Sequence, residues 1–222
     1  MKGVIYTAIA GGFDDLVAPT HRIPDVDYIC FSDDPAQRSP GWHVKPFAWK
    51  DVDPNRVAKR VKILPHRYLN EYDWSLWIDG NVHITGDLAP FLETHLAQGS
   101  LQAFRHPRRS CIYREAEHCI NRNKDSPALI DRQMARYRCE GMPADFGLSE
   151  NNVIFRHHHE SQVRKIMESW WQEIVDGSRR DQLSLSFALW KEALEPRFFF
   201  EGRALLDELH YFRRVAHRHE LA

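Results

Sequence analysis

Short apolar runs alternate with acidic or glycine-containing loops along the first third of the chain. Residues 2–10 form a β-branched apolar run that ends at Gly11-Gly12, and residues 28–31 form a second run that ends at Ser32-Asp33-Asp34. Apolar runs of this length between turn residues predict buried strands. Because ligands of open α/β sheets bind at the carboxyl ends of strands, we expect a ligand site where these two strands end.

The pattern changes to a helical one over residues 53–72. Asp53 and Pro54 suit a helix cap and first turn, and Val57, Val61 and Leu64 recur at three- and four-residue steps. We therefore predict one helix here, with its apolar stripe on the sheet.

Four basic residues accompany this predicted helix. Arg56, Lys59 and Arg60 are neighbours on a helical surface, and Lys62 follows them. Such a run is usually a solvated face, but its place between the acidic strand ends and the next strand also suits a cationic patch for a ligand.

The rest of the chain continues the alternation of helices and strands. We predict helices over residues 88–98, 116–121, 126–139, 163–175 and 183–192, and strands over residues 101–104 and 148–156. No repeat or long linker interrupts the order. The expected architecture is one α/β domain over residues 1–222, with a mixed central sheet flanked by helices, a nucleotide-binding part over about 1–90 and an acceptor-side part over about 91–222.

The stretch WSLWIDGNVHI, residues 74–84, allows two interpretations. An Asp-Gly pair between alternating apolar residues is a strong signal of a hairpin turn. The side chains of Asp79 and Asn81 would alternatively converge in an extended segment, with Gly80 letting a ligand approach. Their oxygen atoms would suit Mg²⁺ or Mn²⁺.

Composition narrows the class of partner. The chain of 222 residues has 30 basic and 31 acidic residues and is 43% hydrophobic, which gives no electrostatic preference for nucleic acid or membrane. Its longest apolar run is shorter than the roughly 20 residues of a membrane-spanning helix. We expect a cytoplasmic protein with at most peripheral membrane association, and its four cysteines lack CxxC spacing and suit reduced thiols.

Several motifs in their order resemble the DUF616 family, also called TOD1/MUCI70-like, a group of glycosyltransferases with a GT-A-like fold. The segments that carry the resemblance are residues 6–14, 27–33, 41–42, 62–66, 77–81, 106–109 and 180–184, with the sequences YTAIAGGFD, DYICFSD, GW, KILPH, WIDGN, HPRR and RDQLS. The resemblance extends from Tyr6 to about Lys191.

This resemblance implies a nucleotide-sugar donor, a UDP-sugar, and a glycan or glycolipid hydroxyl as acceptor. It places Asp79-Gly80-Asn81 at the DxD motif that holds Mn²⁺ or Mg²⁺, with an amide in place of the second acid. The residues that it places around the donor are Thr7, Ala8 and Asp33 at the nucleoside and Arg56, Arg60 and Lys62 at the diphosphate. His106 and Arg109 would contact donor or acceptor from a loop.

Three further roles are assigned to the second half of the chain. A third metal ligand in such enzymes is commonly a histidine near the C-terminus; His210, His217 and His219 are candidates, and we choose His217. Asp181 and Gln182 are the catalytic candidates, because a carboxylate could deprotonate the acceptor and a carboxylate or amide could assist on the donor face. Asp181 could equally cap the helix that follows it, and Glu150 could supply another carboxylate.

Two other functions stay open at the level of sequence. A metal-dependent hydrolase of a phosphate ester or amide could use Asp79, His83 and the histidine-rich residues 157–160, although we expect that segment to be a polar connection. A catalytically inactive binding protein of the same fold is conceivable because Asn81 replaces an acid.

Overall fold

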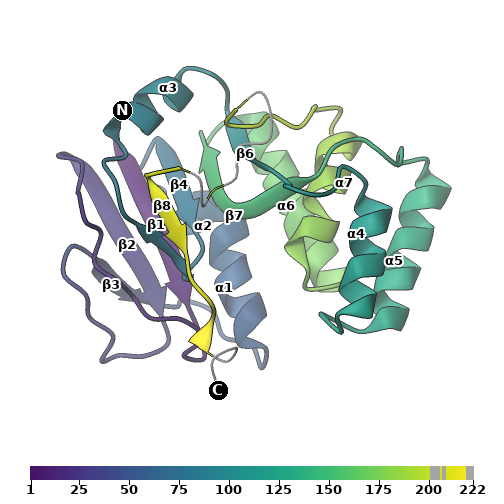
Figure 1. The fold of residues 1–222 in the computed structure, drawn as a ribbon, viewed down its shortest axis with the longest axis horizontal. Coiled ribbons are helices and arrows are strands. Elements are labelled where there is room, and N and C mark those ends of the chain that lie inside the picture. Colours follow the sequence, from purple (N-terminus) through teal and green to yellow (C-terminus); the bar gives the residue numbers. More distant parts are fainter. Residues whose placement is uncertain (201–205, 207–208, 219–222) are drawn as a thin grey trace.

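The computed structural model describes residues 1–200, 206 and 209–218, and its centre is one six-stranded sheet (Figure 1). The strand order is β3-β2-β1-β4-β7-β6. The bounds are β3 His43–Pro46, β2 Val26–Ser32, β1 Gly3–Ile9, β4 Trp74–Ile78, β7 Ser149–Arg156 and β6 Leu101–Arg105. The first four strands run parallel, whereas β7 is antiparallel to both β4 and β6. The predicted α/β fold with a mixed sheet is confirmed.

Each face of the sheet has its own cover. Val4, Tyr6 and Ala8 of β1 pack in one core with helices α1 (Pro54–Ile63), α6 (Ser161–Asp176) and α7 (Leu185–Lys191). Ile5 points to the other face, against helix α3 (Ala89–Leu96) and the two-stranded sheet of β5 (Val82–Ile84) and β8 (Phe212–Arg214). Because successive side chains of β1 point to opposite faces and both faces are covered, every position of β1 is buried.

A helical hairpin stands beside the sheet, on the right of Figure 1. It consists of α4 (Ile112–Asn121) and α5 (Pro127–Glu140). Its core includes Tyr137, which stacks on Phe187 of α7, and Leu183 of the short 3₁₀ helix η1 (Asp181–Leu183). The hairpin thus packs directly against the segment that carries Asp181.

The structure corrects one predicted helix and adds a strand. The helix expected over residues 53–72 starts as predicted, with Asp53 accepting a hydrogen bond from the Asn55 amide, but it ends at Ile63. A separate turn, α2 (Pro65–Tyr68), follows, because Pro65 disfavours helical backbone at the preceding residue. Strand β3 was not predicted, since its four residues are mixed in polarity.

The Asp-Gly stretch is a turn but not a hairpin. The amide of Val82 donates to the Asp79 carbonyl at 2.9 Å, yet β4 pairs with β1 and β7 while β5 pairs with β8. Gly80 is not among the glycines with a positive φ. The space around it is tight, because a Cβ there would lie 2.8 Å from Asp14 Oδ2 and 3.2 Å from Ile9 Cγ1.

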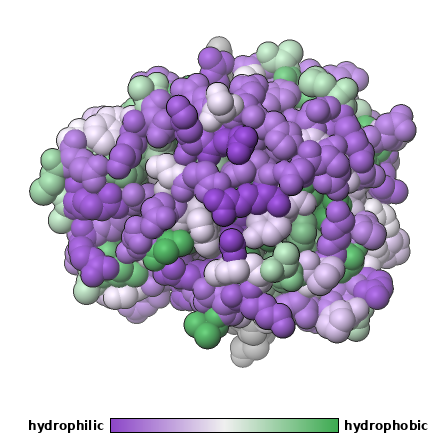
Figure 2. Space-filling model, turned by 180° about the vertical axis from the view of Figure 1, so that it is seen from behind, coloured by the Kyte–Doolittle hydropathy of each residue, from purple (hydrophilic) through white to green (hydrophobic). Residues whose placement is uncertain are grey.

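Hydrophilic residues dominate the face of the molecule shown in Figure 2, and the hydrophobic residues on it are scattered. None of the described helices combines the length and the hydrophobicity needed to cross a membrane. All four cysteines are free thiols, as expected, and three of them are buried.

Candidate active site

A cavity of about 520 Å³ opens where β1 and β4 end. Its walls come from the end of β1, the inner side of α1, the Asp79 turn, β7, the loop before η1 and the segment that follows β8. Residues from both predicted parts of the chain therefore meet at the edge of the sheet where the first two strands predicted a ligand site.

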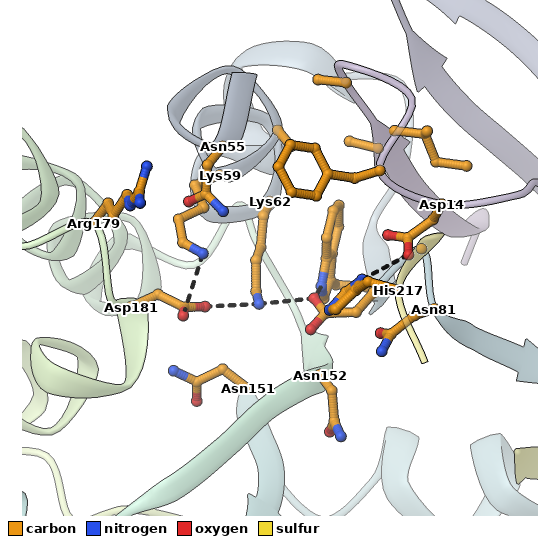
Figure 3. A pocket seen from close by; sticks show the side chains of 18 of the residues that line it. Asp14, Asn55, Lys59, Lys62, Asn81, Asn151, Asn152, Arg179, Asp181 and His217 are labelled. Atoms are coloured by element: carbon orange, nitrogen blue, oxygen red, sulfur yellow. Dashed lines mark hydrogen bonds and ion pairs between the residues drawn. The ribbon is translucent and has the colours of Figure 1, made fainter. Parts of the chain in front are cut away.

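A chain of ion pairs crosses this cavity (Figure 3). Lys62 Nζ lies 2.9 Å from Asp79 Oδ1 and 2.7 Å from Asp181 Oδ2, and Lys59 Nζ lies 3.5 Å from Asp181 Oδ1. Lys62 and Asp181 are buried. Buried charges persist only when they are paired, so the two lysines and two aspartates depend on one another.

The pairing sets the protonation states. Burial by itself would raise the pKa of the Asp181 carboxyl, but the ammonium groups of Lys59 and Lys62 outweigh it and hold that pKa well below its usual range. Burial opposes the charged form of Lys62 too, yet Asp181 and Asp79 raise its pKa. Both groups are thus charged at neutral pH. A carboxylate this acidic is a poor base.

Strand pairing and an indole position Asp79. Its amide donates to the Asn152 carbonyl of β7 at 2.8 Å, which extends the β4–β7 ladder by one residue. Trp77 Nε1 donates to Asp79 Oδ1 at 2.6 Å. The carboxylate is therefore fixed from both its backbone and its side chain before any ligand arrives.

Asn81 is bound to the C-terminal segment. Its Nδ2 donates to the Val215 carbonyl at 2.9 Å, and the Val215 amide donates back to the Asn81 carbonyl at 2.9 Å. An aspartate could not make the first of these bonds, because a carboxylate has no donor. The amide in the second position of the motif thus holds the segment that carries His217 over the cavity.

The predicted metal ligands line one cavity, and their donor chemistry suits a divalent ion. Asp79, Asn81 and His217 supply a carboxylate, an amide oxygen and an imidazole, which together fit Mn²⁺ or Mg²⁺. In the structure His217 Nδ1 instead lies 2.6 Å from Asp14 Oδ1. In the described part of the chain, no three or more His, Cys, Asp or Glu side chains are grouped so that they could hold a metal ion by themselves. His210 is exposed at the surface, and His219 lies outside the described residues.

The loop that carries Asp181 is held by the helical hairpin. Asp125 accepts hydrogen bonds from Ser178 Oγ at 2.7 Å and from the Arg179 amide at 2.9 Å, and Gln133 accepts from the Ser178 amide at 3.0 Å. Asp181 itself opens η1, and its side chain makes no helix cap. The capping interpretation of Asp181 is wrong, since its carboxylate is taken up by the two lysines.

Of the three residues predicted at the nucleoside, only Ala8 lines the cavity. Thr7 is buried and its hydroxyl has no partner, while Asp33 Oδ2 accepts from the Gly11 amide at 2.8 Å. Gly11 and Gly12 both have positive φ, at 66° and 64°, so this contact ties the turn after β1 to the end of β2.

The three arginines and the histidine that were also predicted at the donor lie outside the cavity lining. Arg56 donates to the Val175 carbonyl at 3.2 Å, and Arg60 lies over the Trp49 ring at 4.6 Å. Arg109 forms a close ion pair with Glu115, and burial lowers the pKa of His106 to about 4. The described contacts of these side chains are structural, and their predicted ligand roles stay predictions.

The residues of the hydrolase alternative are not brought together. His158 is buried at the opposite end of β4, with its ring nitrogens 3.0 Å from Ser75 Oγ and 3.1 Å from the Leu69 carbonyl. His157 and His159 also contact carbonyls. The segment is the polar connection that was expected. His83, on β5, is not part of the cavity lining.

Sequence reasoning missed two cavity residues on β7. Asn151 and Asn152 are 2% and 6% exposed and line the cavity. The signal was present in SENNVIF, where four polar residues, two of them adjacent amides, open a strand that continues as an apolar run. An alternating strand would send them to opposite faces, so the pattern alone did not suggest a shared site.

The segment after β1 and the Asp-Gly-Asn turn after β4 therefore both line one charged cavity at the edge of an α/β sheet. A family model described as the TOD1/MUCI70 glycosyltransferase-like domain matches residues 43–208. The chain belongs to this family, which confirms the resemblance seen in the motifs.

One curated relative of the chain is similar at low sequence identity. The chain is 27% identical over 212 residues to a probable hexosyltransferase MUCI70 of Arabidopsis thaliana, covering 82% of this chain and 36% of that protein. The chain therefore spans about a third of the curated relative that it matches.

Two solved glycosyltransferases are similar in shape at low sequence identity. The galactosyltransferase LgtC, in complex with donor and acceptor sugar analogues, has a TM-score of 0.45 at 11% identity, covering 88% of this chain and 72% of its own. The bifunctional glycosyltransferase WbbM has a TM-score of 0.47 at 9% identity, covering 88% of this chain and 38% of its own.

Proposed function

We propose that this protein transfers a hexosyl group from a nucleoside diphosphate sugar, a uridine one, to a hydroxyl group of a glycan or glycolipid. The observation that carries the proposal is the buried Lys62 ammonium between Asp79 and Asp181 in the cavity at the strand ends. Family membership and the relation to a probable hexosyltransferase support it.

The charged residues suit the departure of a diphosphate. Lys59 and Lys62 would face negative charge as it develops on the leaving nucleoside diphosphate, and fixed cations in a buried site stabilise such charge strongly. Asp181 stays ionised, because its pKa is held low. Its acidity favours an electrostatic role on the donor face, beside Gln182, over deprotonation of the acceptor.

We also propose that the protein requires Mn²⁺ or Mg²⁺. Glycosyltransferases of this fold commonly use divalent metals. Asp79, Asn81 and His217 would hold the ion, which as a Lewis acid would add to the neutralisation of the diphosphate. Lys62 already places a positive charge beside Asp79. The lysine and the metal ion would therefore both neutralise charge on the diphosphate.

Isothermal titration with UDP, with and without Mn²⁺, tests donor binding, and release of free sugar from UDP-hexoses tests turnover. We expect metal-dependent binding and slow cleavage of the donor. Asp181→Asn should reduce cleavage about 100-fold or more, as loss of one electrostatic contact in a buried site does. The control is Asp131→Asn, an exposed position on α5.

Each outcome has a separate meaning. Failure of UDP and UDP-hexoses to bind at millimolar concentration would overturn the donor class. Tight binding without any cleavage or transfer would instead support an inactive binding protein of this fold.

A further inference from the structure

The ladder between β6 and β7 is interrupted at the cavity. Ala103 pairs with Ile154, but the next residue of β6, Phe104, pairs with Glu150. Residues 151–153 of β7 thus bulge away from β6, while β7 keeps its pairing with β4 at Val153. Bulges re-aim side chains and recur next to active sites.

The bulge places two adjacent amide residues at the cavity. Alternation would place Asn151 and Asn152 on opposite faces, yet both line the cavity, below the Asp181–Lys62 ion pair in Figure 3. The backbone at this point is fixed, because the Asn152 carbonyl accepts from the Asp79 amide at 2.8 Å. The amides therefore occupy defined positions relative to the Asp79 turn.

Three of the four side-chain polar atoms of these amides have no partner. Asn151 Oδ1 accepts from Ser149 Oγ at 2.6 Å, whereas Asn151 Nδ2 and both polar atoms of Asn152 are buried and unbonded. Buried amides are normally satisfied, and leaving them open is costly. A ligand in the cavity would supply the missing hydrogen-bond partners.

We propose that Asn151 and Asn152 form the subsite for the hydroxyl groups of the transferred hexose. A neutral amide offers both a donor and an acceptor, as a sugar hydroxyl does, so the pair recognises an uncharged polyhydroxyl ring. The nearby charges of Lys62, Asp79 and Asp181 form ion pairs and are assigned above to the diphosphate, the metal and the donor face, which leaves the neutral amides for the sugar. The proposal rests on the proposed function and adds which residues read the sugar.

The test compares ligands that differ only in the sugar. Isothermal titration measures the Kd of UDP and of UDP-glucose, UDP-galactose and their N-acetyl derivatives for the wild type, Asn151→Ala, Asn152→Ala and the exposed control Asn70→Ala. In the wild type we expect at least one hexose donor to bind more tightly than UDP. Each cavity variant should weaken that donor about tenfold, as loss of one hydrogen bond does, and leave the Kd of UDP within about twofold.

The comparison within each variant separates recognition from folding, because misfolding would weaken UDP and UDP-hexose alike. Equal losses for both ligands, no loss for either, or equal affinity of the wild type for UDP and every hexose donor would overturn the subsite. Absence of UDP binding in the wild type would overturn the proposed function itself.

Discussion

The two ends of β4 both bury polar side chains, and they do so in different ways. At its start, Ser75 and His158 are buried and each ring nitrogen of the histidine has an oxygen partner. At its end, Asp79 belongs to an ion-pair chain that borders a cavity, beside Asn152, whose amide has no partner. Buried polar groups that have hydrogen-bond partners stabilise the fold. Buried polar groups that line a cavity and have no partner are candidates for contact with a ligand.

The largest expected effect is at the cavity end. Lys62→Met should lower donor cleavage about 100-fold or more, because it removes the ammonium that would face the leaving diphosphate and leaves Asp79 without its cation. Initial rates with a saturating UDP-hexose measure it. Lys165→Met, at an exposed position on α6, is the control, and a Lys62→Met rate above one tenth of the wild-type rate would contradict the assignment.

At the other end of β4 the expected effect is on stability and not on turnover. His158→Leu removes the 3.0 Å contact to Ser75 Oγ and the 3.1 Å contact to the Leu69 carbonyl, which then keeps only the Tyr72 amide, and this should lower the free energy of unfolding by about 1 to 3 kcal/mol. Urea denaturation measures this, with the exposed His159→Leu as control. The contrast between the two ends would break if His158→Leu reduced cleavage per folded molecule as much as Lys62→Met does.

A pH titration separates the two ends further. Burial lowers the pKa of His158 to about 3, so the folded imidazole stays neutral while the unfolded one takes up a proton near pH 6.5. Stability should therefore fall as the pH drops below about 6.5, by up to about 1.4 kcal/mol per pH unit from this histidine. His158→Gln should flatten the slope by that amount, and an unchanged slope would show that other groups set it.

Asp181 acts in a lower pH window. Its depressed pKa contributes stability that is fully present above the pKa of an unfolded aspartate, near 3.9, and is lost as the pH falls toward the folded-state value. Asp181→Asn should consequently leave the slope of stability between pH 7 and pH 5 unchanged. A changed slope in that range would mean that Asp181 is not held as a carboxylate by the lysines.

The smallest expected effect concerns the amide of the Asp-Gly-Asn turn. Asn81→Asp loses the donor to the Val215 carbonyl, so the metal-free protein should be less stable by about 1 to 2 kcal/mol. The added charge should make Mn²⁺ stabilise the variant more than it stabilises the wild type. Thermal unfolding with and without Mn²⁺ measures both terms, and equal stabilisation of the two proteins would argue against a metal at this turn.

Much of the fold could be predicted because it depends on local patterns. The apolar runs before Gly11 and Asp79 are strands, and Asp53 caps a helix as its residue type suggests. The helix beyond Ile63 was overestimated, since the apolar periodicity continues through Pro65 although the backbone cannot. The apolar periodicity of the side chains thus continues beyond the last residue of the helix.

The cationic patch of α1 shows where local reasoning ends. Arg56, Lys59 and Arg60 are neighbours on the helix, but only Lys59 and the following Lys62 line the cavity. The spacing of residues predicts which of them share a face of a helix. The packing of α1 against the sheet and α6 then decides which of those residues lie at the cavity. The same limit applies to β7, where a bulge shifts the register with β6 and two adjacent amides line the cavity.

The sequence by itself determined the class of fold, the family and the position of the Asp79 turn, because strand periodicity, turn chemistry and the order of motifs are properties of neighbouring residues. The tertiary structure alone decided the membership of the site. The site combines residues that are far apart along the chain, namely Lys59, Asp79, Asn152 and Asp181. Their charges and unbonded amide form a site only because packing brings them to one cavity.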